Sequence, residues 1–242
     1  MPSSATRPAP GRVEIVATRR PHVVVHVAVS VDGATTGFDP DVRRFYALTR
    51  TWDEDVTLTG ADTILAQEEA LAVVQRPGPA ATAPLLAVVD GRGRVKEWEA
   101  LRDCGHWSDV LALHAAATPA HARAEHVPAL VTGTQRVDLA AALRVLGERE
   151  GAEVVRVDSG GALIGALLRA GLVDELSLLV HPRVVGAAGD HSWHGSSPSP
   201  TLSLERLTSE SLAGGLVWLR YVCSRSAARP ESMRRRSNLV ER

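Results

Sequence analysis

Short apolar runs alternate with longer stretches of helical periodicity through the middle of the chain. Most of the runs end close to a glycine, an aspartate or a proline, the residues that favour turns, so each run predicts a buried strand. These predicted strands lie at residues 22–30, 56–59, 85–90, 110–114, 130–132, 154–157 and 176–180. Strands that alternate with helices in this way predict an α/β domain.

Helical patterns fill several of the intervals between the strands. Asp138 precedes a run whose leucines share one face, and an aspartate in that place caps a helix. Gly171 follows another apolar pattern and stops it. We therefore expect helices at residues 41–52, 138–150 and 160–170, and two late, antiparallel strands at residues 202–207 and 216–222.

The two ends of the chain differ in composition from its middle. Residues 1–20 are polar and rich in proline, and residues 226–242 carry a run of arginines, so we expect a flexible lead and a flexible charged tail around one domain at residues 21–225. No stretch reaches the roughly 18 consecutive apolar residues of a membrane-spanning helix. The first dozen residues lack the apolar core of a secretory signal, so we expect a cytoplasmic protein without a membrane partner.

Charge and cysteine content narrow the classes of function. The 27 lysines and arginines balance 28 acids, so the net charge of −1 gives no reason to expect a nucleic-acid partner. Two cysteines are too few for a disulfide framework or a cysteine-rich zinc site. Cys104 with His106, and His191 with His194, lack a third and a fourth ligand at zinc-binding spacing, so we expect no metal.

The most informative stretch is the apolar strand at residues 154–157 followed by Asp158, Ser159, Gly160 and Gly161, where a helix begins. Small residues between a strand and a helix let a ligand approach the backbone, and the free N–H groups of the helix start attract an anion. One interpretation is therefore a phosphate or pyrophosphate site, and the other is glycines that serve packing alone. Asp-Ser-Gly-Gly also surrounds the nucleophile of trypsin-like proteases, but here the motif opens a helix and no all-β pattern accompanies it.

This turn belongs to a longer set of motifs along the chain. They are Ser30 and Asp32 after the first strand, Arg50 in the helix that follows, Gly60 to Thr63 after the second strand, and the run from Asp158 to Leu176. Over about residues 21–224 the arrangement resembles the reductase family of riboflavin biosynthesis, which is related in fold to dihydrofolate reductase. The resemblance implies a three-layer fold, in which a central, mostly parallel sheet lies between helices on both faces and ends in antiparallel strands.

The resemblance implies NADPH as the cofactor and assigns residues to it. Thr63 matches a position that contacts NADPH, and Gln67 stands four residues later, where the family usually has an acid. The glycine-rich turn that cradles the pyrophosphate of the dinucleotide corresponds to Ser159, Gly160, Gly161, Ala162 and Leu163.

The substrate side departs further from the family pattern. Asp158 stands where a substrate-binding glutamate is usual, His26 where asparagine is common, and Arg50 matches a substrate-binding arginine. Ser30 lies at the mouth of the expected site and is a further substrate-binding candidate. Because hydride transfer needs one proton at the reduced centre, Asp32 and Asp158 are candidate catalytic groups that orient substrate hydroxyls or relay that proton. The alternatives are an ordinary Asp-Gly turn for Asp32 and a helix cap for Asp158.

The activity implied by the resemblance is the NADPH-dependent reduction of a ribosylamino-pyrimidine 5′-phosphate or a related heterocycle, in which a ribosyl group becomes ribityl. The departures on the substrate side indicate a substrate other than the usual riboflavin precursor, and the protein is expected to be a homodimer. Two alternatives stay open. One is a dihydropteridine or dihydrofolate reductase, and the other is a non-catalytic nucleotide-binding protein on the same scaffold.

Two further segments invite a functional interpretation. Asp174 and Glu175 form an acidic pair between a helix and a strand, where such pairs usually face solvent or a partner. Residues 190–200 are polar and rich in proline and serine, so they form either a lid or a plain loop. The sequence lacks the H-x-E…P-C-x-x-C pattern of the zinc deaminase that is often fused to this reductase.

Overall fold

The computed structural model describes residues 20–122, 126–186, 192–195 and 201–224. The predicted lead at residues 1–20, apart from Arg20, and the predicted tail at residues 226–242 lie outside these ranges. Within the described ranges, none of the helices combines the length and the apolar character needed to cross a membrane.

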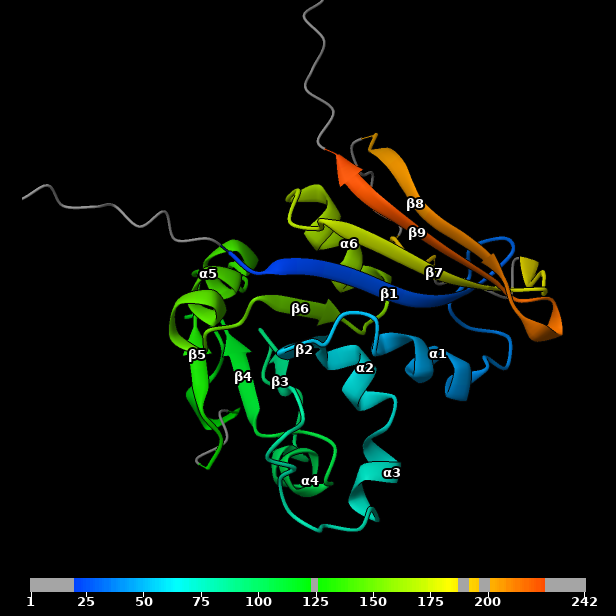
Figure 1. Cartoon of the computed structure of the whole chain (residues 1–242). Coiled ribbons are helices and arrows are strands. Elements are labelled where there is room, and N and C mark those ends of the chain that lie inside the picture. Colours follow the sequence, from blue (N-terminus) through cyan, green and yellow to red (C-terminus); the bar gives the residue numbers. More distant parts are fainter. Residues whose placement is uncertain (1–19, 123–125, 187–191, 196–200, 225–242) are drawn as a thin grey trace, which may run out of the picture.

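The described strands form a single nine-stranded sheet in the order β5-β4-β3-β2-β6-β1-β7-β9-β8. Figure 1 shows this order running from β8 and β9 at the upper right to β5 at the lower left. Neighbours from β5 to β7 are parallel, whereas β9 is antiparallel to both β7 and β8. This confirms the predicted α/β sheet and its antiparallel end. The strands are β1 (His22–Ser30), β2 (Val56–Gly60), β3 (Leu85–Val89), β4 (Val110–His114), β5 (Ala129–Val131), β6 (Val154–Val157), β7 (Glu175–His181), β8 (Ser203–Ser211) and β9 (Val217–Ser224).

The longer helices lie where the hydrophobic pattern predicts them: α1 (Val42–Thr49), α5 (Leu139–Arg149) and α6 (Gly161–Arg169). Asp138 caps α5 as predicted, because its carboxylate accepts a hydrogen bond from the Ala141 N–H at 3.0 Å. The sequence pattern does not predict three shorter helices, α2 (Ala61–Leu65), α3 (Glu68–Ala72) and α4 (Trp98–Asp103). Each spans fewer than two turns, which is too short for a periodicity to be recognised. Short 3₁₀ turns lie at η1 (Ala120–Ala122) and η3 (Ala213–Gly215).

Helices cover both faces of the sheet, as the resemblance implies. Val23 and Val25 of β1 pack in one apolar cluster with α5 and α6. Val24, the residue between them, packs in a second cluster with Phe45 of α1. Successive side chains of a strand point to opposite faces, so β1 separates the two layers. A third cluster packs α2 and α4 against β3 and β4.

The pairing of β2 with β6 decides where polar side chains gather. Leu58 and Val157 align in this parallel pair and point into the core under α5 and α6. Thr57 and Arg156 also align, and they point to the opposite face because the side-chain period of a strand is two. Both strands end at the same edge of the sheet, and each runs into a turn that starts a helix.

His26 of β1 is fully buried beneath α1. Its ring stacks on Phe45 with ring centroids 4.2 Å apart. Nε2 lies 3.2 Å from the Phe45 carbonyl oxygen, which can only accept, so Nε2 carries the ring proton. Nδ1 lies 2.9 Å from Ser177 Oγ and accepts a hydrogen bond from that hydroxyl. Burial is the main reason that the pKa of His26 falls to about 3. His26 is therefore a neutral residue of the core.

The buried histidine predicts a pH dependence of stability. The pKa of His26 is about 3 in the folded protein, against about 6.5 in an unfolded chain. Below about pH 6.5 the unfolded state therefore binds a proton at His26 that the folded state does not bind. The stability that the neutral, buried His26 contributes is lost as the pH falls from about 6.5 towards 3. His26→Asn should reduce the slope of the unfolding free energy against pH between about pH 6 and pH 4 by up to about 1.4 kcal/mol per pH unit, measured by urea unfolding. The exposed His194→Asn is the control, and equal slopes in both variants would contradict the assignment.

Candidate active site

A cavity of about 460 Å³ opens on the α1 and α2 face of the sheet, beside the carboxyl ends of β2 and β6. It receives side chains from six regions: α1, β2 with the turn before it, α2 and α3, β3, the segment around α4, and β6 with the residue that follows it. The lining residues are Tyr46, Thr49, Glu54, Thr57, Thr59, Thr63, Ile64, Gln67, Leu71, Leu86, Leu101, Cys104, His106, Trp107, Arg156 and Asp158. Thr63, Gln67 and Asp158, three of the residues predicted from the sequence, thus meet at one cavity.

A buried guanidinium forms the charged part of the cavity wall. Arg156 is 2% exposed; its Nε donates to Glu54 at 2.7 Å and its Nη1 to Asp158 at 3.0 Å. Nη2 lies 3.4 Å from the Thr57 hydroxyl. Burial lowers the pKa of Arg156, but the carboxylates of Asp158 and Glu54 outweigh it and raise that pKa, so the group stays charged. The family resemblance does not point to Arg156, although a lone charge inside an apolar strand next to Asp158 is a usable signal in the sequence.

Tyr46 of α1 faces the same carboxylate. Partial burial raises the pKa of its phenol, and the negative charge of Asp158 raises it further. The phenol therefore stays protonated at neutral pH. Tyr46, Asp158, Arg156 and Glu54 form a continuous polar row from α1 across β6 to the turn before β2.

The serine of the glycine-rich turn joins the two motifs that the family resemblance assigns to the site. Ser159 Oγ accepts a hydrogen bond from the Gly60 N–H at 3.2 Å and lies 3.2 Å from the Thr63 hydroxyl. The turn after β6 is therefore held against the turn after β2. The pairing of β2 with β6 brings these turns together, and the hydrogen bonds of Ser159 hold them in contact.

The two glycines of this turn have different surroundings. Gly160 is exposed in an extended conformation, and a Cβ added there would meet nothing within 4 Å. Gly161 is buried, and a Cβ added there would collide with the Ser192 carbonyl oxygen and lie 2.6 Å from the Gly195 nitrogen. Close packing of residues 192–195 on α6 thus requires Gly161, whereas Gly160 leaves the helix start open to a ligand. Ala162 beside it is exposed, and Leu163 packs in the core.

Ser30, Asp32 and Arg50 do not line the cavity. The Asp32 carboxylate accepts hydrogen bonds from the Ser30 hydroxyl at 2.5 Å and from the Gly186 N–H at 2.7 Å. The Ser30 hydroxyl and the backbone N–H groups of Gly186 and Val185 lower the pKa of Asp32 to about 2, which makes it a poor proton donor at neutral pH. Asp32 thereby ties the turn after β1 to the segment after β7. Arg50 is exposed at the carboxyl end of α1.

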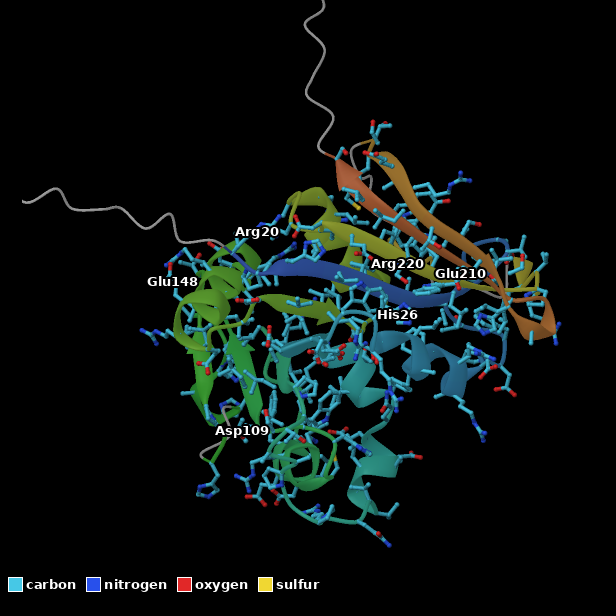
Figure 2. The ribbon with its side chains drawn as sticks, in the orientation of Figure 1. Arg20, His26, Asp109, Glu148, Glu210 and Arg220 are labelled. Atoms are coloured by element: carbon cyan, nitrogen blue, oxygen red, sulfur yellow. The ribbon has the colours of Figure 1, made fainter. Side chains whose placement is uncertain are left out.

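The acidic pair after α6 stabilises the fold. Asp174 bonds the Arg20 guanidinium at 2.5 and 2.7 Å. Glu175 is buried, contrary to the expectation that it faces solvent or a partner, and it accepts from Arg220 at 2.6 Å and from the Trp52 indole at 3.0 Å. Figure 2 labels Arg20 at the start of β1 and Arg220 on β9. Although burial raises the pKa of Glu175, its hydrogen bonds with His22, Arg220 and Trp52 keep that pKa below the usual range.

The other end of the cavity is apolar. Ile64, Leu71, Leu86, Leu101 and Trp107 belong to the cluster between α2, α4, β3 and β4. Cys104 and His106, which the sequence does not predict to bind a metal, also line this cavity. Within the described part of the chain, no group of three or more His, Cys, Asp or Glu residues is placed to hold a metal ion.

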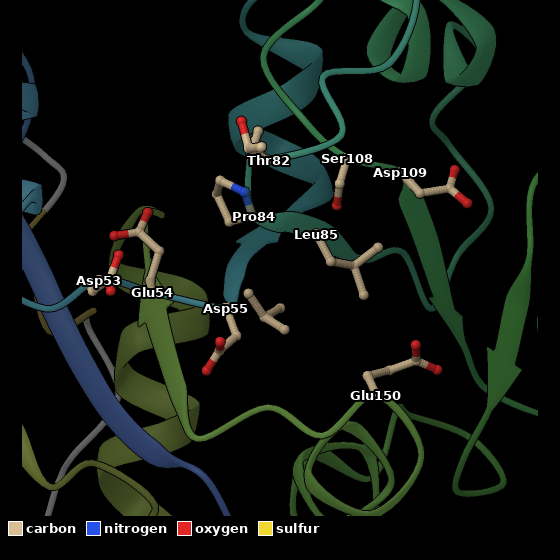
Figure 3. Close-up of a pocket in the computed structure, with 11 residues that line it drawn as sticks. Asp53, Glu54, Asp55, Thr82, Pro84, Leu85, Ser108, Asp109 and Glu150 are labelled. Carbon is tan, nitrogen blue, oxygen red and sulfur yellow. The ribbon is translucent and has the colours of Figure 1, made fainter.

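A second cavity of about 480 Å³ lies at the amino ends of β2 and β3 (Figure 3). Its lining residues are Asp53, Glu54, Asp55, Val56, Thr82, Ala83, Pro84, Leu85, Ser108, Asp109 and Glu150. None of these described residues is a cation. The Asp55 carboxylate, moreover, accepts from the N–H groups of Glu153 and Val154 at 2.8 and 2.9 Å, so it organises the start of β6. This cavity lies at the opposite ends of the strands from the glycine-rich turn.

Comparison with known proteins identifies the family. The family described as the RibD C-terminal domain matches residues 21–218. The chain belongs to this family. A curated relative from Methanothermobacter thermautotrophicus, named 2,5-diamino-6-ribosylamino-4(3H)-pyrimidinone 5′-phosphate reductase, is 31% identical over 181 residues, which are 69% of this chain and 80% of the relative. An Archaeoglobus fulgidus protein of the same name is 29% identical over 185 residues, 69% of this chain and 83% of its own.

Solved structures of RibD-type proteins share the fold. A pyrimidine reductase-like protein from Corynebacterium diphtheriae has a TM-score of 0.67 at 18% identity, over 85% of this chain and 92% of its own. The riboflavin biosynthesis reductase Rib7 of Saccharomyces cerevisiae has a TM-score of 0.64 at 20% identity, over 85% of this chain and 90% of its own. The fold implied by the resemblance is thereby confirmed.

The different surroundings of the two glycines predict different responses to a methyl group. Gly161→Ala should lower the free energy of unfolding by about 1–3 kcal/mol, because residues 192–195 have to move away from α6. Gly160→Ala should change it by less than about 1 kcal/mol, since the position is open and helical caps tolerate the exchange within that range. Urea unfolding of both variants measures the difference. Equal losses would mean that residues 192–195 do not pack on Gly161 in solution.

Proposed function

We propose that the protein is a nicotinamide-dependent reductase of a ribosylamino-pyrimidine 5′-phosphate or a related heterocycle, with NADPH as the reductant. The observation that carries the proposal is the bridge made by Ser159 to Gly60 and Thr63, at a cavity that Thr63, Gln67 and Asp158 line. Family membership and the reductases named among the relatives support it.

The residues around the glycine-rich turn fit a dinucleotide. A Cβ at Gly160 would meet open space, so a diphosphate has room to reach the backbone there. The first N–H groups of α6 have no acceptor within the helix, and the positive end of its dipole favours an anion. Gly160 and Ala162 are exposed at this end, and Thr63 and Gln67 line the adjoining cavity. When bound, the cofactor would supply a hydride.

Asp158, with Arg156 and Tyr46 beside it, would orient the substrate. Asp158 is held from one side by Arg156 and faced by Tyr46 from the other. A carboxylate fixed in this way accepts hydrogen bonds from substrate hydroxyl or amino groups in a single orientation, which is the positioning that hydride transfer needs. The role of Asp32 stays a prediction, and the hydrogen bonds of its carboxylate point to the turn after β1 instead of the cavity.

The proposal predicts both turnover and cofactor binding. The protein should oxidise NADPH in the presence of 2,5-diamino-6-ribosylamino-4(3H)-pyrimidinone 5′-phosphate, followed by the loss of NADPH absorbance, and should not do so with dihydrofolate. Gly160→Asp should weaken NADPH binding about tenfold or more by placing a like charge beside the diphosphate, whereas Gly160→Asn should leave it nearly unchanged. Asp and Asn both cap helices well, so the fold of each variant is retained.

Calorimetric titration with NADPH and with NADH tests the predicted binding of the cofactor. A wild-type protein that binds neither dinucleotide would refute the proposed function. Equal affinities of Gly160→Asp and Gly160→Asn would remove Gly160 from the cofactor site.

We further propose that the protein is a homodimer that pairs through β8. This strand ends the described sheet, and its Leu204 and Leu207 are 43% and 49% exposed. An exposed edge strand with apolar side chains is a site for pairing with another chain. Sedimentation should give twice the mass of the chain for the wild type, and Leu204→Glu combined with Leu207→Glu should give a monomer. Val73→Glu, at an exposed residue of the segment after α3, is the control, and a monomeric wild type would contradict the proposal.

A further inference from the structure

Three buried polar atoms at the carboxyl ends of β3 and β4 and on α4 are unusual in their hydrogen bonding. Asp90 Oδ1, Trp98 Nε1 and His114 Nε2 have no hydrogen-bond partner among the described residues. The three residues are 1%, 3% and 0% exposed, so bulk solvent does not reach them. Buried polar atoms of folded proteins are nearly always hydrogen-bonded, and three such atoms in one region indicate a partner that they share.

The register of the sheet and the packing of α4 bring the three side chains together. Val88 of β3 aligns with Ala112 of β4, and both pack in the apolar cluster that contains Trp98. Asp90 and His114 follow these residues by two positions, so their side chains point to the same face of the sheet. The His114 ring meets the Trp98 indole at a right angle, with ring centroids 6.2 Å apart.

The neighbouring hydrogen bonds decide what each of the three atoms can do. His114 Nδ1 lies 2.7 Å from the Asp90 carbonyl oxygen, which can only accept, so in the neutral ring Nδ1 carries the proton and Nε2 is an acceptor. Asp90 Oδ2 accepts from the Val95 N–H at 2.9 Å, which leaves Oδ1 as a second acceptor. Trp98 Nε1 can only donate. The cluster therefore presents two acceptors and one donor.

We propose that one water molecule binds between Asp90, Trp98 and His114 and bridges the three atoms. A water donates two hydrogen bonds and accepts at least one, which matches this set, and buried waters typically make about three bonds. A metal ion or an ammonium group has no lone pair for the Trp98 N–H, so neither satisfies all three atoms.

The bridging water positions α4 relative to the sheet. Trp98 lies on α4, and Leu101, three residues later in the same helix, lines the candidate active site. Residues three apart lie on the same side of a helix, so a bond that holds Trp98 also holds the part of α4 that forms the apolar end of the cavity. The water site thus lies outside the lining of the cavity and supports one of its walls.

A crystal structure that shows ordered solvent tests the site directly. A density peak should lie within about 3.2 Å of Asp90 Oδ1, Trp98 Nε1 and His114 Nε2 at once. Direct hydrogen bonds among these atoms, or the lack of such a peak, would overturn the proposal. A peak at about 2.0–2.2 Å from the histidine nitrogen, the distance of a coordinated metal ion, would overturn it as well.

Hydrogen exchange in solution tests the positioning role with a matched pair of variants. Trp98→Phe removes the donor and keeps an aromatic ring on α4, so the water loses one of its three bonds. The Val95 N–H, which bonds Asp90 Oδ2, should then exchange with deuterium about fivefold faster. Trp107→Phe is the control, because Trp107 packs against the same cluster without reaching the three atoms, and it should leave that rate nearly unchanged. A rate that Trp98→Phe does not change, or that both variants raise equally, would overturn the role of the water.

Discussion

The parallel pairing of β2 with β6 is the constraint on which the site depends. It aligns Leu58 with Val157 in the core and leaves Thr57 beside Arg156 on the opposite face. Because parallel strands end at the same edge, the turns that follow them lie side by side, and the Ser159 hydroxyl bonds one to the other. Without this pairing, residues about a hundred positions apart in the chain would not share a cavity.

The buried guanidinium of Arg156 is the second determinant of the site. Removing a guanidinium from water is unfavourable unless carboxylates and hydrogen bonds replace the solvent, and Glu54 and Asp158 both do so. The same contacts hold Asp158 in one position and place two carboxylates and one guanidinium at the cavity. Packing, orientation of the site carboxylate and the charge presented to a ligand are therefore consequences of one set of ion pairs.

Particular residues show how far the pattern of the sequence reaches. The short apolar runs predicted β1, β4 and β6 with their observed bounds, and Asp138 marked the start of α5, because these signals are local. The glycine pair at the start of α6 is ambiguous in the sequence, because its two interpretations depend on what packs there. Residues 192–195 pack on Gly161 and not on Gly160. Glu175 was expected at the surface, because its partners Trp52 and Arg220 are far away in the sequence.

The sequence by itself determined the α/β architecture, the order of most elements, the family resemblance and the two motifs that meet at the cavity, because hydrophobic period, caps and turn residues act over a few neighbours. Only the tertiary structure decided that Asp32 ties down a turn, that His26 belongs to the core, and that Arg156 lies between two carboxylates. Those outcomes depend on which strands become neighbours and on which face a side chain is buried. Burial and distant partners, which no local pattern records, set the charge and the hydrogen bonds of each group.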